Sequence, residues 1–267
     1  MKYALKIDIL RIIETMIKFP RTMNVVMFLS LSCISLEAKS EDINILAESV
    51  PSEIENLPEN RVGGVGGEVL TEALKANNIT FKMVWTRWKV AQQQVQANKD
   101  KKSFIVPLTR NPEREAKYNW VAKIYEVNTV FFIKKGNRKI NFLKEIEGKK
   151  IGVLFESSYE QKIINAKGAA FKNEIASVPY DNLNARKLLT GEIDAWYDSI
   201  IGGNAFIKNE KLDRNQFEYG NVIDKEDNYI ATTNSTSSVL INKVKNAIET
   251  FKKTKKYSEI IDKYFTK

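Results

Sequence analysis

The sequence predicts an α/β protein of two lobes, each a mixed β-sheet flanked by helices. Short apolar runs rich in β-branched residues alternate with amphipathic helical patterns along most of the chain. The alternation occurs as two series, one ending near residue 108 and one beginning at residue 129. Hydrophobic residues make up 43% of the 267 residues, which is enough to form the cores of two lobes.

The first series predicts three strands separated by two helices. The strands are expected at residues 43–48 (INILAE), 81–85 (FKMVW) and 103–108 (SFIVPL), where short runs contain mainly apolar and β-branched residues. Helical patterns at residues 67–78 and 88–99 lie between them. This βαβαβ order predicts the first lobe.

The second series predicts the other lobe and a return of the chain to the first. Its strands and helices are expected at residues 129–135, 150–155, 158–174, 176–180, 184–192 and 193–199. Near the C-terminus, residues 239–253 carry one apolar stripe at helical spacing, made of Leu240, Val244, Ala247, Ile248 and Phe251. A last helix is expected around Ile260, Ile261 and Tyr264.

The N-terminal segment predicts a secretory signal peptide over residues 1–38. Arg21 precedes an apolar run of about a dozen residues, and small or polar residues up to Ala38 follow it. The run is shorter than the roughly 20 residues of a membrane-spanning helix. We therefore expect export to the periplasm and cleavage near Ala38.

Two details of this segment bear on its processing. A lipid anchor on Cys33 is not expected, because Ser30 stands where a lipoprotein signal has a residue like leucine. Residues 1–15 precede the usual start of a signal peptide, and initiation at Met16 or Met23 would account for them.

Composition and glycine spacing argue against several functions. The chain has no histidine and one cysteine, which excludes His-ligated metals, His-based triads and Cys-rich metal sites. The glycines of residues 63–67 do not fit the G-x-G-x-x-G spacing, and residues 147–150 (EGKK) lack the rest of a phosphate loop. The net charge is +9, but the lysines are scattered and no nucleic-acid-binding motif is present. We expect a non-enzymatic protein with no cofactor, no metal and no nucleic-acid partner.

Five segments in chain order resemble the family 3 periplasmic solute-binding proteins, the amino-acid-binding components of ABC importers. The segments are INILAESVPS (43–52), GEVLTEALKANNI (67–79), LTRNPEREAKYNW (108–120), IEGKKIGVLFESSYE (146–160) and LLTGEIDAWYDS (188–199). The resemblance implies the type II periplasmic binding protein fold, with mixed sheets flanked by helices and two hinge crossings. Lobe 1 would comprise residues 42–126 plus 231–267, and lobe 2 residues 127–230.

The resemblance also implies a function. The two lobes would close about crossings near residues 125–130 and 227–232, and the ligand would lie in the cleft between them. The protein would capture an amino acid outside the cytoplasm and deliver it to an ABC permease in the inner membrane. We expect it to act as a monomer.

An amino acid requires a site with both signs of charge, because its carboxylate and ammonium would otherwise be buried without partners. The resemblance assigns carboxylate binding to Arg114, whose planar guanidinium offers two parallel donors, and places the Thr109 hydroxyl in the same pocket. Pro112 stiffens the loop that carries Arg114. The alternative is that Arg114 pairs with a neighbouring glutamate at the surface. Arg110 is assigned to the surface or rim.

The second lobe is expected to supply the remaining contacts to the backbone of the amino acid. Ser157 and Ser158 follow a strand and open a helix, where hydroxyl and backbone N–H groups form an anion site. Either serine can instead serve as a helix cap, and we assign ligand binding to Ser158 in preference to Ser157. The resemblance implies that Asp198 binds the ammonium, although it comes one residue earlier than in the usual family spacing.

Two further residues bear on specificity. Glu48, at the end of the first strand, would favour a cationic or hydroxyl-bearing ligand, whereas Arg87 would favour an acidic one. We therefore predict a small polar or charged amino acid. Two alternatives remain open: a dehydratase of the same fold, similar to cyclohexadienyl dehydratase, with Glu48 or Glu156 as acid or base, and a sensory solute-binding module.

Overall fold

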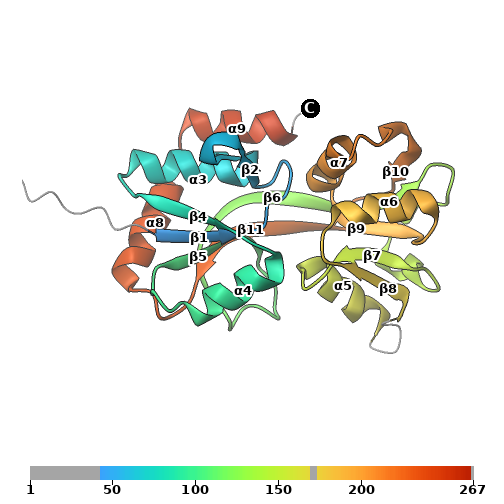
Figure 1. Ribbon diagram of the computed structural model, residues 1–267, viewed down its shortest axis with the longest axis horizontal. Coiled ribbons are helices and arrows are strands. Elements are labelled where there is room, and N and C mark those ends of the chain that lie inside the picture. The colour runs from blue at the N-terminus through green and yellow to red at the C-terminus, as the bar shows by residue number, and fades with distance from the viewer. Residues whose placement is uncertain (1–42, 169–172, 266–267) are drawn as a thin grey trace, which may run out of the picture. The chain divides into compact units, whose positions relative to one another are not determined.

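The computed structural model describes residues 43–168 and 173–265 as a two-lobed α/β fold (Figure 1). The predicted signal peptide, residues 1–38, lies outside the described residues. One mixed sheet runs through both lobes in the order β4-β1-β5-β11-β6-β9-β7-β8, with β10 paired to β6. Its strands are β1 (Ile43–Ala47), β4 (Phe81–Trp85), β5 (Ser103–Thr109), β6 (Asn119–Lys134), β7 (Ile151–Leu154), β8 (Ile175–Val178), β9 (Ala195–Ser199), β10 (Phe217–Tyr219) and β11 (Asp224–Thr232).

Lobe 1 has a hydrophobic core on each face of its parallel strands β1, β4 and β5. Successive side chains of a strand point to opposite faces, so Ile45 packs on one side and Leu46 on the other. Helices α3 (Gly64–Ala76), α8 (Ser238–Phe251) and α9 (Lys255–Phe265) cover the Ile45 face. Helix α4 (Trp88–Ala97) covers the Leu46 face. The short strands β2 (Glu55–Leu57) and β3 (Arg61–Gly63) pair separately.

Lobe 2 repeats this layered arrangement. Strands β7 and β8 are parallel, and β9 runs parallel to β7 on its other side. Phe131 and Ile133 of β6 pack with helix α5 (Ser158–Lys167), whereas Val130 and Phe132 pack with α6 (Asn182–Thr190) and α7 (Ile200–Asn209). The alternating pattern of this strand therefore supplies both cores of the lobe.

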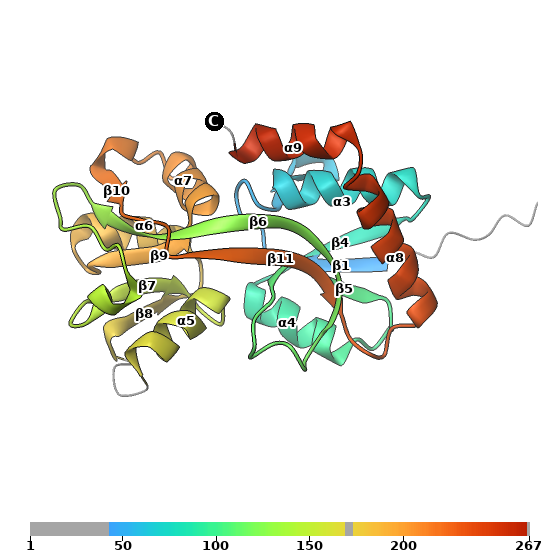
Figure 2. The ribbon, with the colours of Figure 1, turned by 180° about the vertical axis from the view of Figure 1, so that it is seen from behind.

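Strands β6 and β11 connect the two lobes. They pair antiparallel over nearly the whole length of β11, and Figure 2 shows them running side by side between the lobes. They contain the two stretches, residues 125–130 and 227–232, that were predicted as hinge crossings. The predicted fold class, with two lobes and two crossings, is confirmed.

Some element boundaries differ from the predictions. Strand β6 begins at Asn119, well before the predicted residue 129, because the hinge strand also pairs with β11. Helix α5 ends at Lys167, followed by Gly168 at a φ of 81°. Helix α7 was not predicted, because Gly202 and Gly203 resemble loop residues, yet Gly203 lies where a Cβ would overlap the Phe132 ring. Within the described ranges, no helix combines the length and apolar character needed to cross a membrane.

Candidate functional site

Segments that follow strands of both lobes line one cavity of about 60 Å³. Lobe 1 contributes Glu48 after β1, Thr109 at the end of β5 and Arg114 in the loop that follows, and lobe 2 contributes Ser157 and Ser158 after β7. The carboxyl ends of strands are the usual place for ligands in open α/β sheets. A cavity of this size has room for about four water molecules, which suits a small ligand.

Arg114 is a buried cation in the wall of this cavity, with 7% of its surface exposed. Its Nη1 donates to the Thr109 carbonyl oxygen at 3.2 Å, and its Nη2 lies 3.4 Å from the Glu156 carbonyl oxygen of lobe 2. Burial lowers the pKa of Arg114, but a guanidinium remains charged in proteins. No carboxylate of the described residues lies within ion-pair distance of it. The guanidinium therefore retains N–H donors for an anion.

Arg110 has a different environment from Arg114. It makes two hydrogen bonds to the Glu115 carboxylate, at 2.9 and 2.5 Å, and its guanidinium lies against the Trp120 and Tyr229 rings. Its side chain is 42% exposed. The surface ion pair proposed as the alternative for Arg114 is thus formed by its neighbour Arg110.

The two serines of the α5 N-terminus have distinct partners. The Ser157 Oγ accepts a hydrogen bond from the Glu160 amide at 3.1 Å and donates to the Leu154 carbonyl oxygen at 2.6 Å, so Ser157 is the helix cap. The Ser158 Oγ donates to Glu226 Oε2 at 3.1 Å. The first-turn amides of Ser158 and Tyr159 have no acceptor within the helix, so the backbone itself offers donors at the cavity.

Asp198 lies near the end of β9 and lines the same cavity, with 3% of its surface exposed. Its Oδ1 accepts a hydrogen bond from the Ser199 amide at 2.6 Å, whereas its Oδ2 is buried and receives none among the described residues. Burial, followed by the nearby carboxyl groups of Asp181 and Glu53, raises the pKa of Asp198 well above its usual value. Such a carboxyl lacks a cationic partner.

Glu48 lines the cavity, and Arg87 does not. The Glu48 Oε2 accepts a hydrogen bond from the Trp88 amide at 2.8 Å, at the start of α4. Burial raises the pKa of Glu48 to about 7. Arg87 is the exposed residue just before α4, so a contact between Arg87 and a ligand stays a prediction from sequence.

The cavity residues that were not identified from the sequence include the carboxyl and amide side chains of Glu53, Asp181 and Asn228. Glu53 of lobe 1 accepts hydrogen bonds from Tyr125 Oη at 2.9 Å and from the Ser199 hydroxyl of lobe 2. Asn228 lies on β11, and its buried Nδ2 has no acceptor among the described residues. Asp181 follows β8 as Ser157 follows β7, a signal that was available in the sequence. Glu53 and Asn228 carried no comparable signal.

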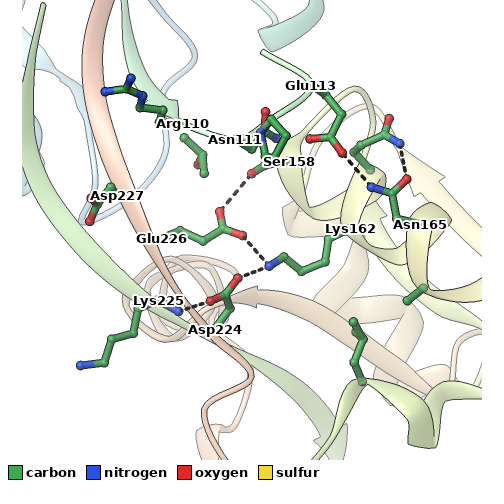
Figure 3. Close-up of a pocket in the computed structure, with 15 residues that line it drawn as sticks. Arg110, Asn111, Glu113, Ser158, Lys162, Asn165, Asp224, Lys225, Glu226 and Asp227 are labelled. Atoms are coloured by element: carbon green, nitrogen blue, oxygen red, sulfur yellow. Dashed lines mark hydrogen bonds and ion pairs between the residues drawn. The ribbon is translucent and has the colours of Figure 1, made fainter. Parts of the chain in front are cut away.

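A wider groove of about 640 Å³ shares Thr109 and Ser158 with the cavity (Figure 3). Charged side chains in this groove form ion pairs, some with one another and some with residues outside it. Lys162 is paired with Asp224 and lies 3.9 Å from Glu226, and Asn165 of α5 donates to Glu113 at 2.8 Å. The inner cavity, in contrast, holds polar atoms without partners.

The cavity presents partners for both an anionic and a cationic group of a ligand. Arg114 and the α5 amides offer donors on one side, and Asp198 offers an acceptor on the other. Among residues 43–168 and 173–265, no group of three or more His, Cys, Asp or Glu side chains is arranged to hold a metal ion.

Solved structures of low sequence identity share this fold. An ancestral arginine-binding protein bound to arginine aligns with a TM-score of 0.72 at 20% identity, over 84% of this chain and 98% of that one. A histidine kinase sensor domain with similarity to periplasmic binding proteins aligns with a TM-score of 0.74 at 12% identity, over 84% and 96%. ArtJ of Geobacillus stearothermophilus, an arginine-, lysine-, histidine-binding protein, aligns with a TM-score of 0.68 at 19% identity, over 85% and 96%.

The family comparison extends over the whole described fold. No curated protein sequence matches the chain. The model of the bacterial extracellular solute-binding proteins, family 3, matches residues 43–267, which include both lobes and every residue that lines the cavity. The chain therefore belongs to the family 3 bacterial extracellular solute-binding proteins.

Proposed function

We propose that this protein captures a small polar or charged amino acid in the inner cavity as its two lobes close. One observation carries the proposal: a buried guanidinium without a carboxylate partner and a buried carboxyl oxygen without a donor line the same cavity. A free amino acid carries the two complementary charges a few bonds apart. Burying either charge of the ligand without a partner would cost several kcal/mol.

The ligand carboxylate would bind the Arg114 guanidinium and the amides at the start of α5, and its ammonium would bind Asp198. The Asn228 amide would donate to the carboxylate. Because Arg114 belongs to lobe 1 and Asp198 to lobe 2, the ligand would be bound fully only with the lobes together. Binding would thus stabilise the closed arrangement, since a ligand favours the state in which it makes more contacts.

The side chain of the ligand would lie toward Glu48. The cavity carries more acidic than basic groups, which favours a ligand whose side chain is cationic or donates hydrogen bonds. Two of the structurally similar proteins are described as binding arginine or other basic amino acids. The small volume of the cavity favours a compact ligand.

A thermal-shift screen tests the proposal. Residues 39–267 would be unfolded and refolded to remove bound ligand and then screened against the protein amino acids. Ligand at 100 times its Kd adds about 2.7 kcal/mol to the free energy of unfolding. We expect stabilisation by one or a few polar or charged amino acids, and no stabilisation by any amino acid would contradict the proposal.

We further propose that the protein is exported through residues 1–38 and delivers its ligand to an ABC permease. Membership in a family of extracellular solute-binding proteins supports this role. Deletion of the gene in its own host should abolish high-affinity uptake of the amino acid identified in the screen. Normal uptake accompanied by loss of a transcriptional or chemotactic response would favour the sensory alternative, whose fold the kinase sensor domain shares.

A second candidate function is a dehydratase of the same fold. The observation that favours it is Glu48, whose pKa of about 7 suits an acid or base at neutral pH. Glu156, the other carboxyl considered, lies on an exposed turn beside Lys89, outside the cavity. Incubation with arogenate or prephenate would distinguish the two functions, because turnover supports the enzyme and stabilisation without turnover supports the binding protein.

A further inference from the structure

Asp181 and Asp198 form a pair of buried carboxyl groups in the wall of the cavity. Asp198 is the acidic residue assigned above to the ligand ammonium. Asp181 comes from the turn between β8 and α6, with 7% of its surface exposed. The pair therefore joins a residue expected to bind the ligand to one that has no assigned role.

The orientation of Asp181 is fixed by two buried donors. Its Oδ1 accepts hydrogen bonds from Asn184 Nδ2 at 2.7 Å and from Trp196 Nε1 at 2.9 Å. Asn184 and Trp196 are both fully buried. Gly152 leaves room for the Asn184 side chain, because a Cβ at position 152 would overlap the side-chain oxygen of Asn184. These two bonds fix one oxygen of the Asp181 carboxyl, and the group interacts electrostatically with Asp198.

The two carboxyl groups require a proton or a cation between them. Between two ionised carboxylates there is no donor, and Asp198 Oδ2 is then buried without a partner. A single proton allows Asp198 to donate a hydrogen bond to Asp181. Burial raises the pKa of Asp198 well above its usual value and that of Asp181 to about 6. We expect the pair to share one proton at neutral pH in the absence of ligand.

The charged groups around the pair are mostly acidic. Arg114 is the one cation among the residues that line the cavity, and it is assigned to the ligand carboxylate. The other titratable groups that line the cavity or act on the pair are Glu48, Glu53, Tyr159 and Tyr197. None of these four groups supplies a positive charge to the pair.

We propose that Asp181 is the second carboxyl group of the ammonium site, and that the ligand ammonium replaces the proton that Asp181 and Asp198 share. The inference rests on the amino-acid binding proposed above. The ligand keeps its charge, its N–H groups donate to both carboxylates, and the displaced proton passes to solvent. Binding then exchanges the shared proton for the ligand ammonium. The closed cavity therefore gains less positive charge than it would if the proton stayed.

Titration calorimetry measures the exchange directly. The amino acid that gives the largest thermal shift would be titrated near pH 7 in two buffers that differ in ionisation enthalpy. We expect the release of about one proton per ligand by the wild-type protein. Asp181→Asn should bind about tenfold more weakly and release far fewer protons, because its amide donates permanently to Asp198.

Asp194→Asn is the matched control. Asp194 is exposed and immediately precedes β9, the strand that carries Asp198. It accepts a hydrogen bond from the Lys150 amide at 2.7 Å, away from the cavity. It should release as many protons as the wild-type protein. An undiminished release by Asp181→Asn, or no release by the wild-type protein, would overturn the inference and leave amino-acid binding intact.

A measurement on the wild-type protein alone covers the case in which Asp181→Asn does not fold. With aspartate labelled by ¹³C at the side-chain carboxyl, NMR of the ligand-free protein at neutral pH should show one protonated aspartate. That signal should move to the ionised position when the amino acid is added. If every aspartate is already ionised without ligand, the shared proton does not exist. Absence of binding in the screen would instead count against the proposed function.

Discussion

At the scale of single residues, the proposed binding depends most on the difference between Arg114 and Arg110. Both follow strand β5, but Arg114 is buried in the cavity wall and Arg110 pairs with Glu115 at the surface. Two parallel donors on a planar fork match a carboxylate in a way that a lysine ammonium cannot. The residue type at position 114 should therefore matter for binding, and that at position 110 should not.

Arg114→Lys should weaken amino-acid binding by roughly tenfold or more, because a hydrogen bond to a charged group contributes about 1.5 to 3 kcal/mol. Arg110→Lys is the matched control and should change the affinity less than twofold, since surface ion pairs contribute about 0 to 1 kcal/mol. Calorimetric titration of the two variants measures the difference. Equal affinities for Arg114→Lys and the wild-type protein would remove Arg114 from the site.

The Glu48 carboxyl predicts a dependence of stability on pH. Its pKa is raised from 4.5 to about 7 by burial, so its protonated form is favoured in the folded protein. The stability it contributes is fully present below the unfolded pKa of 4.5 and is lost as the pH rises through about 7. The raised pKa values of Glu53, Asp181 and Asp198 act in the same direction.

The melting temperature of the ligand-free protein should consequently fall as the pH rises from about 5 to about 8. Glu48→Gln should show a shallower fall, because glutamine cannot ionise. Calorimetric melting curves at constant ionic strength test this. Parallel curves for the two proteins would mean that Glu48 titrates alike in the folded and unfolded chains.

At the scale of elements, the N-terminus of α5 links helix stability to the site. Ser157→Ala removes the bond to the Glu160 amide and should lower the free energy of unfolding by about 1 kcal/mol. It should also weaken binding, because the same turn lines the cavity. Chemical denaturation and titration calorimetry measure the two effects.

Ser237→Ala provides the comparison for this prediction. Ser237 caps α8 through the Leu240 amide at 3.2 Å and does not line the cavity. Its loss should reduce stability to a similar extent and leave the affinity unchanged. If Ser237→Ala lowered the affinity as much as Ser157→Ala does, the lower stability of the protein, and not the position of α5, would account for the weaker binding.

The elements also show which features the sequence made predictable. Strands such as β4 combine short length with apolar residues that favour strands, so local pattern was sufficient. Helix α7 was missed because Gly202 and Gly203 lower helical propensity locally, whereas close packing on Phe132 requires a small residue. Tertiary packing decides such cases, and a single sequence does not display it.

The site residues also divide into those that local sequence pattern predicts and those that depend on tertiary packing. Arg114, Thr109, Ser157, Ser158, Asp198 and Glu48 lie in segments with recognisable order, and all six line one cavity. Glu53 and Asn228 line the cavity because contacts between distant parts of the chain place them there. The bond from Ser199 to Glu53 is one such contact. Arg87 lies beside Trp88, which lines the cavity, but its own side chain is exposed. Side-chain direction at a helix start was not predictable from spacing.

At the scale of the whole molecule, several polar contacts join the lobes beside the hinge strands, among them the bonds from Arg114 and Gln92 to the Glu156 carbonyl oxygen and from Asn165 to Glu113. Ser199 of lobe 2 donates to Glu53 of lobe 1, and Lys89 pairs with Glu156 at 3.2 Å across the cleft. The second pair is about half exposed and contributes little. Because most of these contacts lie at exposed side chains, we expect the ligand-free protein to open about β6 and β11.

X-ray scattering in solution tests this opening. The radius of gyration of the ligand-free protein should decrease when the amino acid is added, as the lobes come together. Arg114→Lys should need more amino acid for the same contraction. A radius of gyration that does not change at saturating ligand would mean that binding does not depend on closure.

The most direct measurement is a crystal structure of the protein with the amino acid that gives the largest thermal shift. The proposed binding predicts the carboxylate of the ligand within hydrogen-bond distance of the Arg114 guanidinium and the α5 amides, and its ammonium within that distance of Asp198. A ligand in the wider groove beside Lys162 and Asp224, or one that contacts a single lobe, would contradict it.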